Sequence, residues 1–190
     1  MNKIRIGLAM TGSFCTFDTT FRAMEALGDA YEFTPLMSER AYATDTRFGS
    51  AQEQRERLKR LCGGREILHS IVDAEPVGPK DYFDLLLIAP CTGNTLSRLA
   101  YGITDSCVSM AAKSHLRGGK PVLLALSTND ALSGSARSLG MLLGRKHVYF
   151  LPFRQDDPAA KPYSLVSDYT HLNLCIQLAL QGKQLQPLLA

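Results

Sequence analysis

Short apolar runs alternate with segments of helical periodicity along most of this chain. The runs at 4–10 and 83–89 contain few polar residues, which is typical of strands buried on both faces. Shorter apolar runs at 31–37, 121–126 and 147–151 predict three more strands. Because strands that alternate with helices form a parallel sheet with helices on both faces, the pattern predicts an α/β fold.

Between the predicted strands, apolar residues recur every three or four positions, as they do on one face of a helix. Helices are expected through 21–27, at 51–61, 96–103, 108–116 and 129–143, and from about 164 to 180. The segment 67–80 holds two prolines, and we expect a loop there with at most one short strand. The predicted fold class is therefore a three-layer, doubly wound parallel sheet, flavodoxin-like (Rossmann-like), with five strands in the order 2-1-3-4-5.

The composition favours a globular protein and argues against nucleic acid, a membrane span and a metal ion. The 190 residues are 45% hydrophobic and 21% charged, which supports one domain over 1–190. A net charge of only +3 argues against nucleic-acid binding. The sequence contains no run of 18 apolar residues, so no membrane span is predicted. The five cysteines form no C-x-x-C pair, which argues against a disulfide framework or a zinc site. We therefore expect no metal and a reducing, cytoplasmic compartment.

Three polar turns follow predicted strands, where doubly wound sheets bind their ligands. They are Thr11-Gly12-Ser13, the segment 90–95 and the segment 127–130. Small residues let backbone amides approach an anion, and side-chain hydroxyls and amides add donors at a helix N-terminus. Because all three turns follow strands of one parallel sheet, we expect them to lie at the same edge of that sheet.

Each turn also has an ordinary structural explanation. Ser, Thr, Asn or Asp ahead of a helix commonly caps it by accepting a hydrogen bond from a first-turn N–H. Thr92 or Asn94 could cap the helix that follows the second turn, and the other two turns could be capping clusters. The chain lacks both G-x-G-x-x-G and G-x-x-x-x-G-K-[ST], so its residues alone favour neither NAD(P) nor ATP.

A histidine and two cysteines are further candidates for catalysis. His69 precedes the strongest strand and is either a catalytic acid or base, or a solvated loop histidine. Cys91 follows the predicted strand at 83–89, and Cys15 lies near the start of the first predicted helix; either could be a reactive thiolate. We interpret both as small buried apolar residues instead.

The chain resembles the flavoprotein family that includes the homo-oligomeric flavin-containing cysteine decarboxylases. The first turn, Ser38 and the run APCTGNTLSRLAYGITDS carry this resemblance. It implies FMN as the cofactor, with the first turn at its phosphate and Ser38 assisting. The family's Pro-x-Ser-x-Asn-Thr segment and closing Asp, together with a later Asn, add further binding residues, which correspond here to Thr92, Asn94, Thr95, Asp105 and Asn129.

Five separated segments resemble the dipicolinate synthase branch of this family more closely, from residue 3 to about residue 187. They are TDTRFG, DAEPVGP, IAPCTGNT, STNDAL and ALQGKQLQP. This resemblance implies an oxidoreductase chain that acts with a partner, the A subunit of that enzyme, in oxidising dihydrodipicolinate to dipicolinate, the calcium-chelating diacid of bacterial spores. NAD(P) would be supplied through the partner, which agrees with the missing glycine-rich turn. A homo-oligomer in the cytoplasm of the mother cell is also expected.

A diacid substrate requires charge-assisted donors, and arginine meets a carboxylate most naturally in bidentate geometry. Arg47, within TDTRFG, is the candidate for this role, and His69 is the candidate acid or base. The alternative for Arg47 is a surface arginine paired with Asp45.

Two other functions stay open at this point. The chain could be a stand-alone FMN-dependent decarboxylase, or a non-catalytic module that binds FMN or phosphate and organises its partner. The decarboxylase branch has a catalytic His at a matched position and a Pro-x-Met-Asn segment. In this chain His69 matches the position of that His only loosely. The segment Ser127-Thr128-Asn129 shares only its Asn with Pro-x-Met-Asn. These departures argue against decarboxylation of a peptidyl cysteine.

Overall fold

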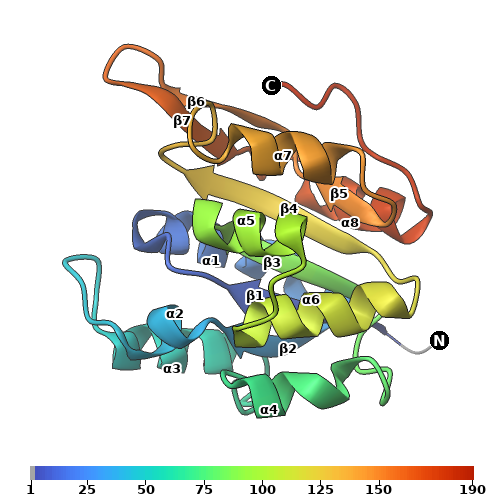
Figure 1. Cartoon of the computed structure of the whole chain (residues 1–190). Coiled ribbons are helices and arrows are strands. Elements are labelled where there is room, and N and C mark those ends of the chain that lie inside the picture. The colour runs from blue at the N-terminus through green and yellow to red at the C-terminus, as the bar shows by residue number, and fades with distance from the viewer. Residues whose placement is uncertain (1–2) are drawn as a thin grey trace.

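The computed structural model describes residues 3–190 and contains one mixed sheet with helices on both faces (Figure 1). Its four central strands run parallel, in the order β2 (Tyr31–Met37), β1 (Ile4–Met10), β3 (Leu85–Cys91) and β4 (Val122–Thr128). The short strand β5 (Val148–Phe150) pairs in parallel with the first half of β4. The predicted α/β class and the order 2-1-3-4-5 are confirmed.

Alternating side chains along the strands divide the core into two layers. In β3, Leu86 and Ile88 face one layer, whereas Leu85 and Leu87 face the other. The first layer is covered by α4 (Ile71–Ala74), α5 (Gly93–Tyr101), α6 (Cys107–Arg117) and α7 (Ala136–Leu143). The second is covered by α1 (Phe17–Glu25), α3 (Ala51–Leu61) and α8 (Leu172–Leu180). No helix within residues 3–190 is long and apolar enough to span a membrane.

A β-hairpin extends the sheet, and this part of the sequence prediction was wrong. The last helix was expected to start near residue 164, but Lys161–Ser167 form strand β7, which pairs antiparallel with β6 (Phe153–Asp157). The chain turns between them where Asp157 Oδ1 accepts hydrogen bonds from two backbone N–H groups. Strand β7 also pairs with the last two residues of β4, so the hairpin projects beyond the carboxyl edge of the sheet, at the top left of Figure 1.

Short helices replace several expected loops and turns. The segment 67–80 forms α4 and the 3-10 helix η3 (Glu75–Val77), because Ser70 and Asp73 build a capping box that starts α4. Helix α2 (Glu39–Ala43) follows β2 directly, and the 3-10 helices η1 (Phe14–Thr16) and η2 (Gly28–Ala30) flank α1. Helix α7 begins only at Ala136, since residues 129–135 form turns instead of the predicted first helical turns.

Candidate functional site

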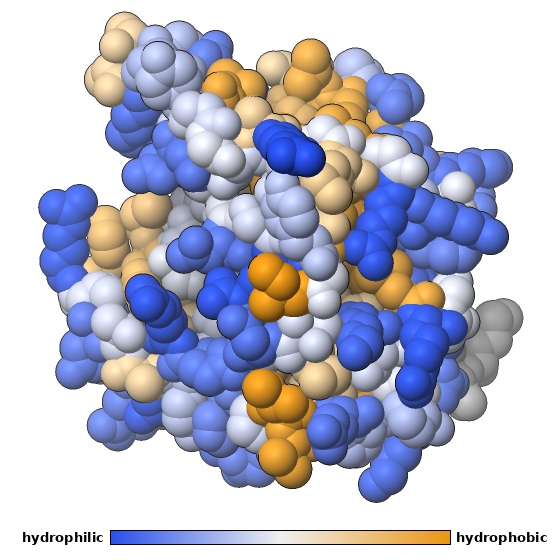
Figure 2. Space-filling view, in the orientation of Figure 1, coloured by the Kyte–Doolittle hydropathy of each residue, from blue (hydrophilic) through white to orange (hydrophobic). Residues whose placement is uncertain are grey.

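A cavity of about 840 Å³ opens at the carboxyl edge of the sheet. One part of its wall comes from the three strand-end turns, at residues 12–16, 92–94 and 126–130, and another part comes from the β6–β7 hairpin. Figure 2 shows the outline notched on the left, below the projecting hairpin. The volume lies in the range of about 300–1,000 Å³ that is typical of ligand and cofactor sites.

Side-chain hydrogen bonds hold the three turns together, which confirms the expectation that they share one edge. The buried Thr11 hydroxyl donates to the Pro90 carbonyl at 2.7 Å and accepts from the Thr92 N–H at 3.0 Å. Ser13 Oγ lies 2.7 Å from Ser127 Oγ. Ser13 makes no side-chain cap bond to the helix that follows, so the capping explanation is wrong for this residue.

The second turn separates the capping residue from a free polar side chain. Thr92 Oγ1 accepts from the Thr95 N–H at 3.3 Å and therefore caps α5. Asn94 is exposed on the cavity wall, and within residues 3–190 its side chain forms no hydrogen bond. Its amide is therefore available to a ligand as both donor and acceptor.

The third turn places a carboxylate beside the start of α5. Asp130 Oδ1 accepts from the Thr128 hydroxyl at 2.6 Å and from the Ser135 hydroxyl at 2.9 Å. A Cβ on Gly93 would lie 2.6–2.7 Å from three oxygens of this group, so only glycine fits there. Since Asp130 brings negative charge to the start of α5, an anionic ligand group is better placed at the first turn. Asn129 is exposed and lines the cavity.

Besides the buried Thr11, three residues named by the family resemblance do not line the cavity. Thr95 is buried behind the second turn, where it contacts Thr92. Ser38 caps α2 by accepting from a first-turn N–H at 3.3 Å. Asp105 pairs with Arg98 at 2.6 Å, and this bond lowers the pKa of the Asp105 carboxyl.

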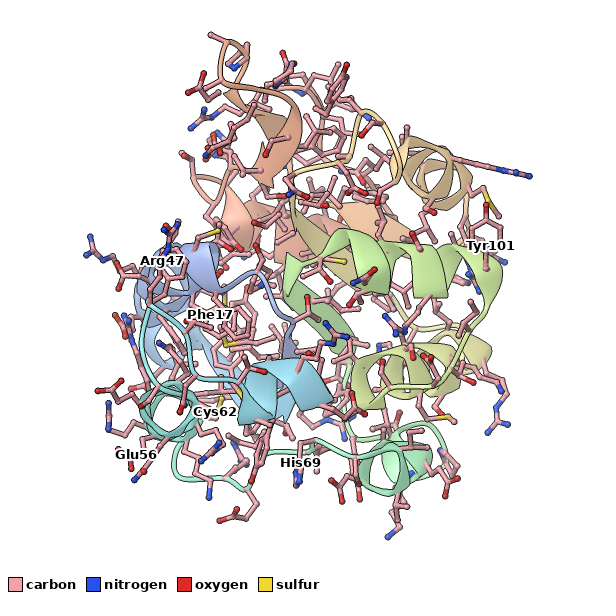
Figure 3. All side chains as sticks on the ribbon, turned by 60° about the vertical axis from the view of Figure 1, so that its left-hand side comes forward. Phe17, Arg47, Glu56, Cys62, His69 and Tyr101 are labelled. Carbon is pink, nitrogen blue, oxygen red and sulfur yellow. The ribbon has the colours of Figure 1, made fainter. Side chains whose placement is uncertain are left out.

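The two residues considered for catalysis are not wall residues either, although Arg47 stacks on Phe48, which is one. The Arg47 guanidinium lies 4.8 Å above the ring of Phe48, while Asp45 accepts a hydrogen bond from a backbone N–H of α3 instead of pairing with Arg47. The ring of His69 stacks on that of Tyr42 at 3.8 Å, and its Nδ1 lies 3.2 Å from a backbone carbonyl. Figure 3 shows Arg47 and His69 at separate places on the periphery.

The two cysteines near strand ends differ in their surroundings. Cys91 is fully buried, and burial raises the pKa of its thiol to about 12, which confirms that it acts as a small apolar residue. The same interpretation was wrong for Cys15, which is exposed on the cavity wall. Among residues 3–190, no three or more His, Cys, Asp or Glu side chains are grouped so that they could hold a metal ion.

Sequence reasoning missed the contribution of the hairpin and its neighbours to the wall. Because residues 152–163 were assigned to no element and the last helix was expected to start near residue 164, no side chain of the hairpin was considered for the site. The signal that could have revealed it is the Asp-Asp-Pro segment at 156–158, a turn sequence between two stretches that can pair as strands. The wall residues missed in this way are Arg154, Asp156, Lys161, Ser164, Val166 and Ser167.

Comparison with known proteins gives a consistent result at the levels of family, sequence and fold. Residues 1–137 match the family model described as Flavoprotein. The chain is 44% identical over 186 residues to the B subunit of dipicolinate synthase from Bacillus subtilis (strain 168), covering 97% of this chain and 92% of that protein. The crystal structure of the dipicolinate synthase B subunit from Bacillus halodurans C is 41% identical, with a TM-score of 0.88 over 100% of this chain and 98% of that one.

A more distant structure shares the fold alone. Burkholderia xenovorans DmrB, solved in complex with FMN, is 16% identical to this chain. The two superpose with a TM-score of 0.65, covering 94% of this chain and 96% of that one.

Proposed function

The chain belongs to the Flavoprotein family, and from that premise we propose that it is the B subunit of a dipicolinate synthase and binds FMN in the cavity at the carboxyl edge. With the A subunit it would oxidise dihydrodipicolinate to dipicolinate, while NAD(P)⁺ takes up a hydride and a proton is released. The observation that carries this proposal is the nearly full-length likeness to the dipicolinate synthase B subunits of two Bacillus species.

The residues of the cavity fit a flavin mononucleotide. A Cβ added to Gly12 would meet only the ring of Phe14, at 3.6–3.9 Å, so the protein leaves the space above this turn unfilled. Ser167 Oγ is buried on the wall without a hydrogen-bond partner, as expected of a group that a ligand would satisfy. Phe14, Leu126 and Val166 add apolar surface for a ring system.

Each turn would have a separate task in holding FMN. Gly12 and Ser13 would receive the phosphate at the start of η1 and α1, away from the Asp130 carboxylate. Asn94 and Asn129 would meet polar edges of the cofactor, since their amides donate and accept without charge. Thr11, Thr92 and Thr95 would keep the turns in position through the hydrogen bonds described above. FMN is a hydride-transfer cofactor, the chemistry that oxidation of a dihydropyridine needs.

The division of labour between two chains follows from the first turn. Thr11-Gly12-Ser13 lacks the G-x-G-x-x-G fingerprint of dinucleotide-binding folds, so we place the NAD(P) site on the A subunit. We also propose that the chain folds as one domain, forms homo-oligomers and acts in the mother-cell cytoplasm of a sporulating bacterium.

Reconstitution with the partner tests this function. The chain is mixed with the A subunit, FMN, NAD(P)⁺ and dihydrodipicolinate, and dipicolinate is followed by the ultraviolet absorbance of its pyridine ring. We expect rapid NAD(P)-dependent formation only when both chains are present. A rate with only the A subunit that equals the rate with both chains would contradict the proposal. Release of carbon dioxide from a peptide with a C-terminal cysteine, by this chain alone, would instead indicate a decarboxylase.

A further inference from the structure

The β6–β7 hairpin presents one face to the cavity. In β6, Phe153 is buried in the core while Arg154 and Asp156 are exposed, which is the alternation expected of a strand with one buried face. Across the hairpin Arg154 pairs in register with Val166, and both residues line the cavity. Because β7 is hydrogen-bonded to Ser127 and Thr128 of β4, this face is held beside the third turn.

Arg154 is a cation on this wall that forms no salt bridge within the described part of the chain. Within residues 3–190 no carboxylate oxygen lies in salt-bridge range of its guanidinium, and its one hydrogen bond is a 3.5 Å contact to the Gln155 carbonyl. The other cation of the hairpin wall, Lys161, is already paired with Asp156 at 2.5 Å. The nearby Asp168 carboxylate accepts from the N–H and hydroxyl of Thr170, at 2.8 and 2.6 Å. These bonds, and to a smaller degree the charge of Arg154, lower the pKa of Asp168.

A guanidinium that forms no salt bridge is suited to bind a carboxylate group of a ligand. Its planar fork of N–H donors matches the two oxygens of a carboxylate, whereas an ammonium acts as a point charge. Ser167 also borders the cavity, but it pairs in register with the buried Phe153 and so lies on the other face of the hairpin from Arg154. Arg47, the residue considered from sequence, is stacked on Phe48 and does not line the cavity.

We propose that Arg154 binds a carboxylate of the pyridine-dicarboxylate substrate and product, and that the β6–β7 hairpin thereby determines substrate specificity. This inference rests on the proposed function for the identity of the diacid. It adds that the diacid is held by this chain, in the same cavity that receives the flavin, and that Arg154 is a binding residue.

Binding of dipicolinate to purified variants tests the inference. The chain is saturated with FMN, and dipicolinate is titrated by calorimetry into the wild type, Arg154→Ala and Arg154→Lys. We expect Arg154→Ala to raise the Kd by about 10- to 100-fold, as loss of a charge-assisted hydrogen bond does. Arg154→Lys should recover part of this loss.

The matched control is Arg137→Ala, which removes an exposed arginine of α7 that does not line the cavity and should leave the Kd within about twofold. Urea unfolding of each variant verifies that it is folded. An unchanged Kd in Arg154→Ala, a loss in Arg47→Ala alone, or a wild-type chain that binds FMN but no dipicolinate would each overturn the inference and leave the flavin site standing. The proposed function fails separately, if the chain takes up no FMN and adds nothing to the rate of the A subunit.

Discussion

His115 shows how burial alters the chemistry of a single residue in this protein. Its side chain is 2% exposed on α6, near the ring of Phe83. Nε2 lies 3.1 Å from the Pro121 carbonyl, so the neutral ring must carry its proton on Nε2 to donate there. Burial first, and the nearby Lys120 second, lower the pKa of His115 from 6.5 to about 4. The histidine is therefore a neutral structural residue at ordinary pH.

This pKa predicts an acid-dependent loss of stability. The unfolded chain binds a proton at this side chain below a pH of about 6.5, whereas the folded chain keeps the ring neutral down to a pH of about 4. The free energy of unfolding should therefore fall by up to about 3 kcal/mol as the pH drops through this window. Urea unfolding of the wild type and of His115→Gln, measured between these limits, checks the prediction.

The variant serves as the control, because glutamine can still donate an N–H to the Pro121 carbonyl but does not titrate. The carboxyls of Asp81 and Asp84, whose pKa values are lowered by bonds to Lys120 and Arg5, lose their contribution only at lower pH. Parallel pH curves for the wild type and the variant would contradict the assignment to His115.

At the scale of elements, two neighbouring residues at the start of helix α5 have different roles. We expect Thr92 to stabilise the fold and Asn94 to bind the ligand. Thr92 caps the helix by accepting a hydrogen bond from the Thr95 N–H, so Thr92→Ala should lower the free energy of unfolding by about 1 kcal/mol. Within residues 3–190 the side chain of Asn94 forms no hydrogen bond, so Asn94→Ala should change the free energy of unfolding by less than about 0.5 kcal/mol. If Asn94 contacts FMN, the same variant should weaken FMN binding by about 1–3 kcal/mol.

Calorimetry with FMN and urea unfolding, applied to both variants, measure the two effects separately. An Asn94→Ala protein with unchanged FMN affinity would remove Asn94 from the site. A large loss of stability in that variant would show that it has a structural role not visible in its contacts.

The central strands could be predicted from sequence because their signal is local, whereas the hairpin could not. Every residue of β3 is buried, and its continuous apolar run is a direct consequence of burial on both faces. In β7, only Ser164 and Leu165 are fully buried, and the strand is defined by its partners β6 and β4. Its apolar residues also fit a helical spacing, and long-range pairing decided between the two structures.

At the scale of the whole molecule, the site could be predicted only as far as it follows from topology. Parallel strands place the ends of β1, β3 and β4 at one edge, so the convergence of Ser13, Asn94 and Asn129 followed from the fold class. Whether Ser38 or Arg47 reaches the cavity depends on how α2 and the connection after it pack, which no local pattern specifies. The part of the wall formed by the hairpin, with Arg154, could not be predicted either, because no local pattern specifies how the hairpin packs.

The central claim is that the cavity at the carboxyl edge holds FMN, and a fluorescence titration of the chain with FMN tests it most directly. We expect one FMN per wild-type chain, with the affinity reduced at least about tenfold in Gly12→Val, because the added side chain enters the space left for the ligand. The free energy of unfolding should be little changed in this variant, and Gly140→Val, at an open position on α7, should bind FMN like the wild type. A wild-type chain that takes up no FMN, or a Gly12→Val protein that binds it equally well, would contradict the account.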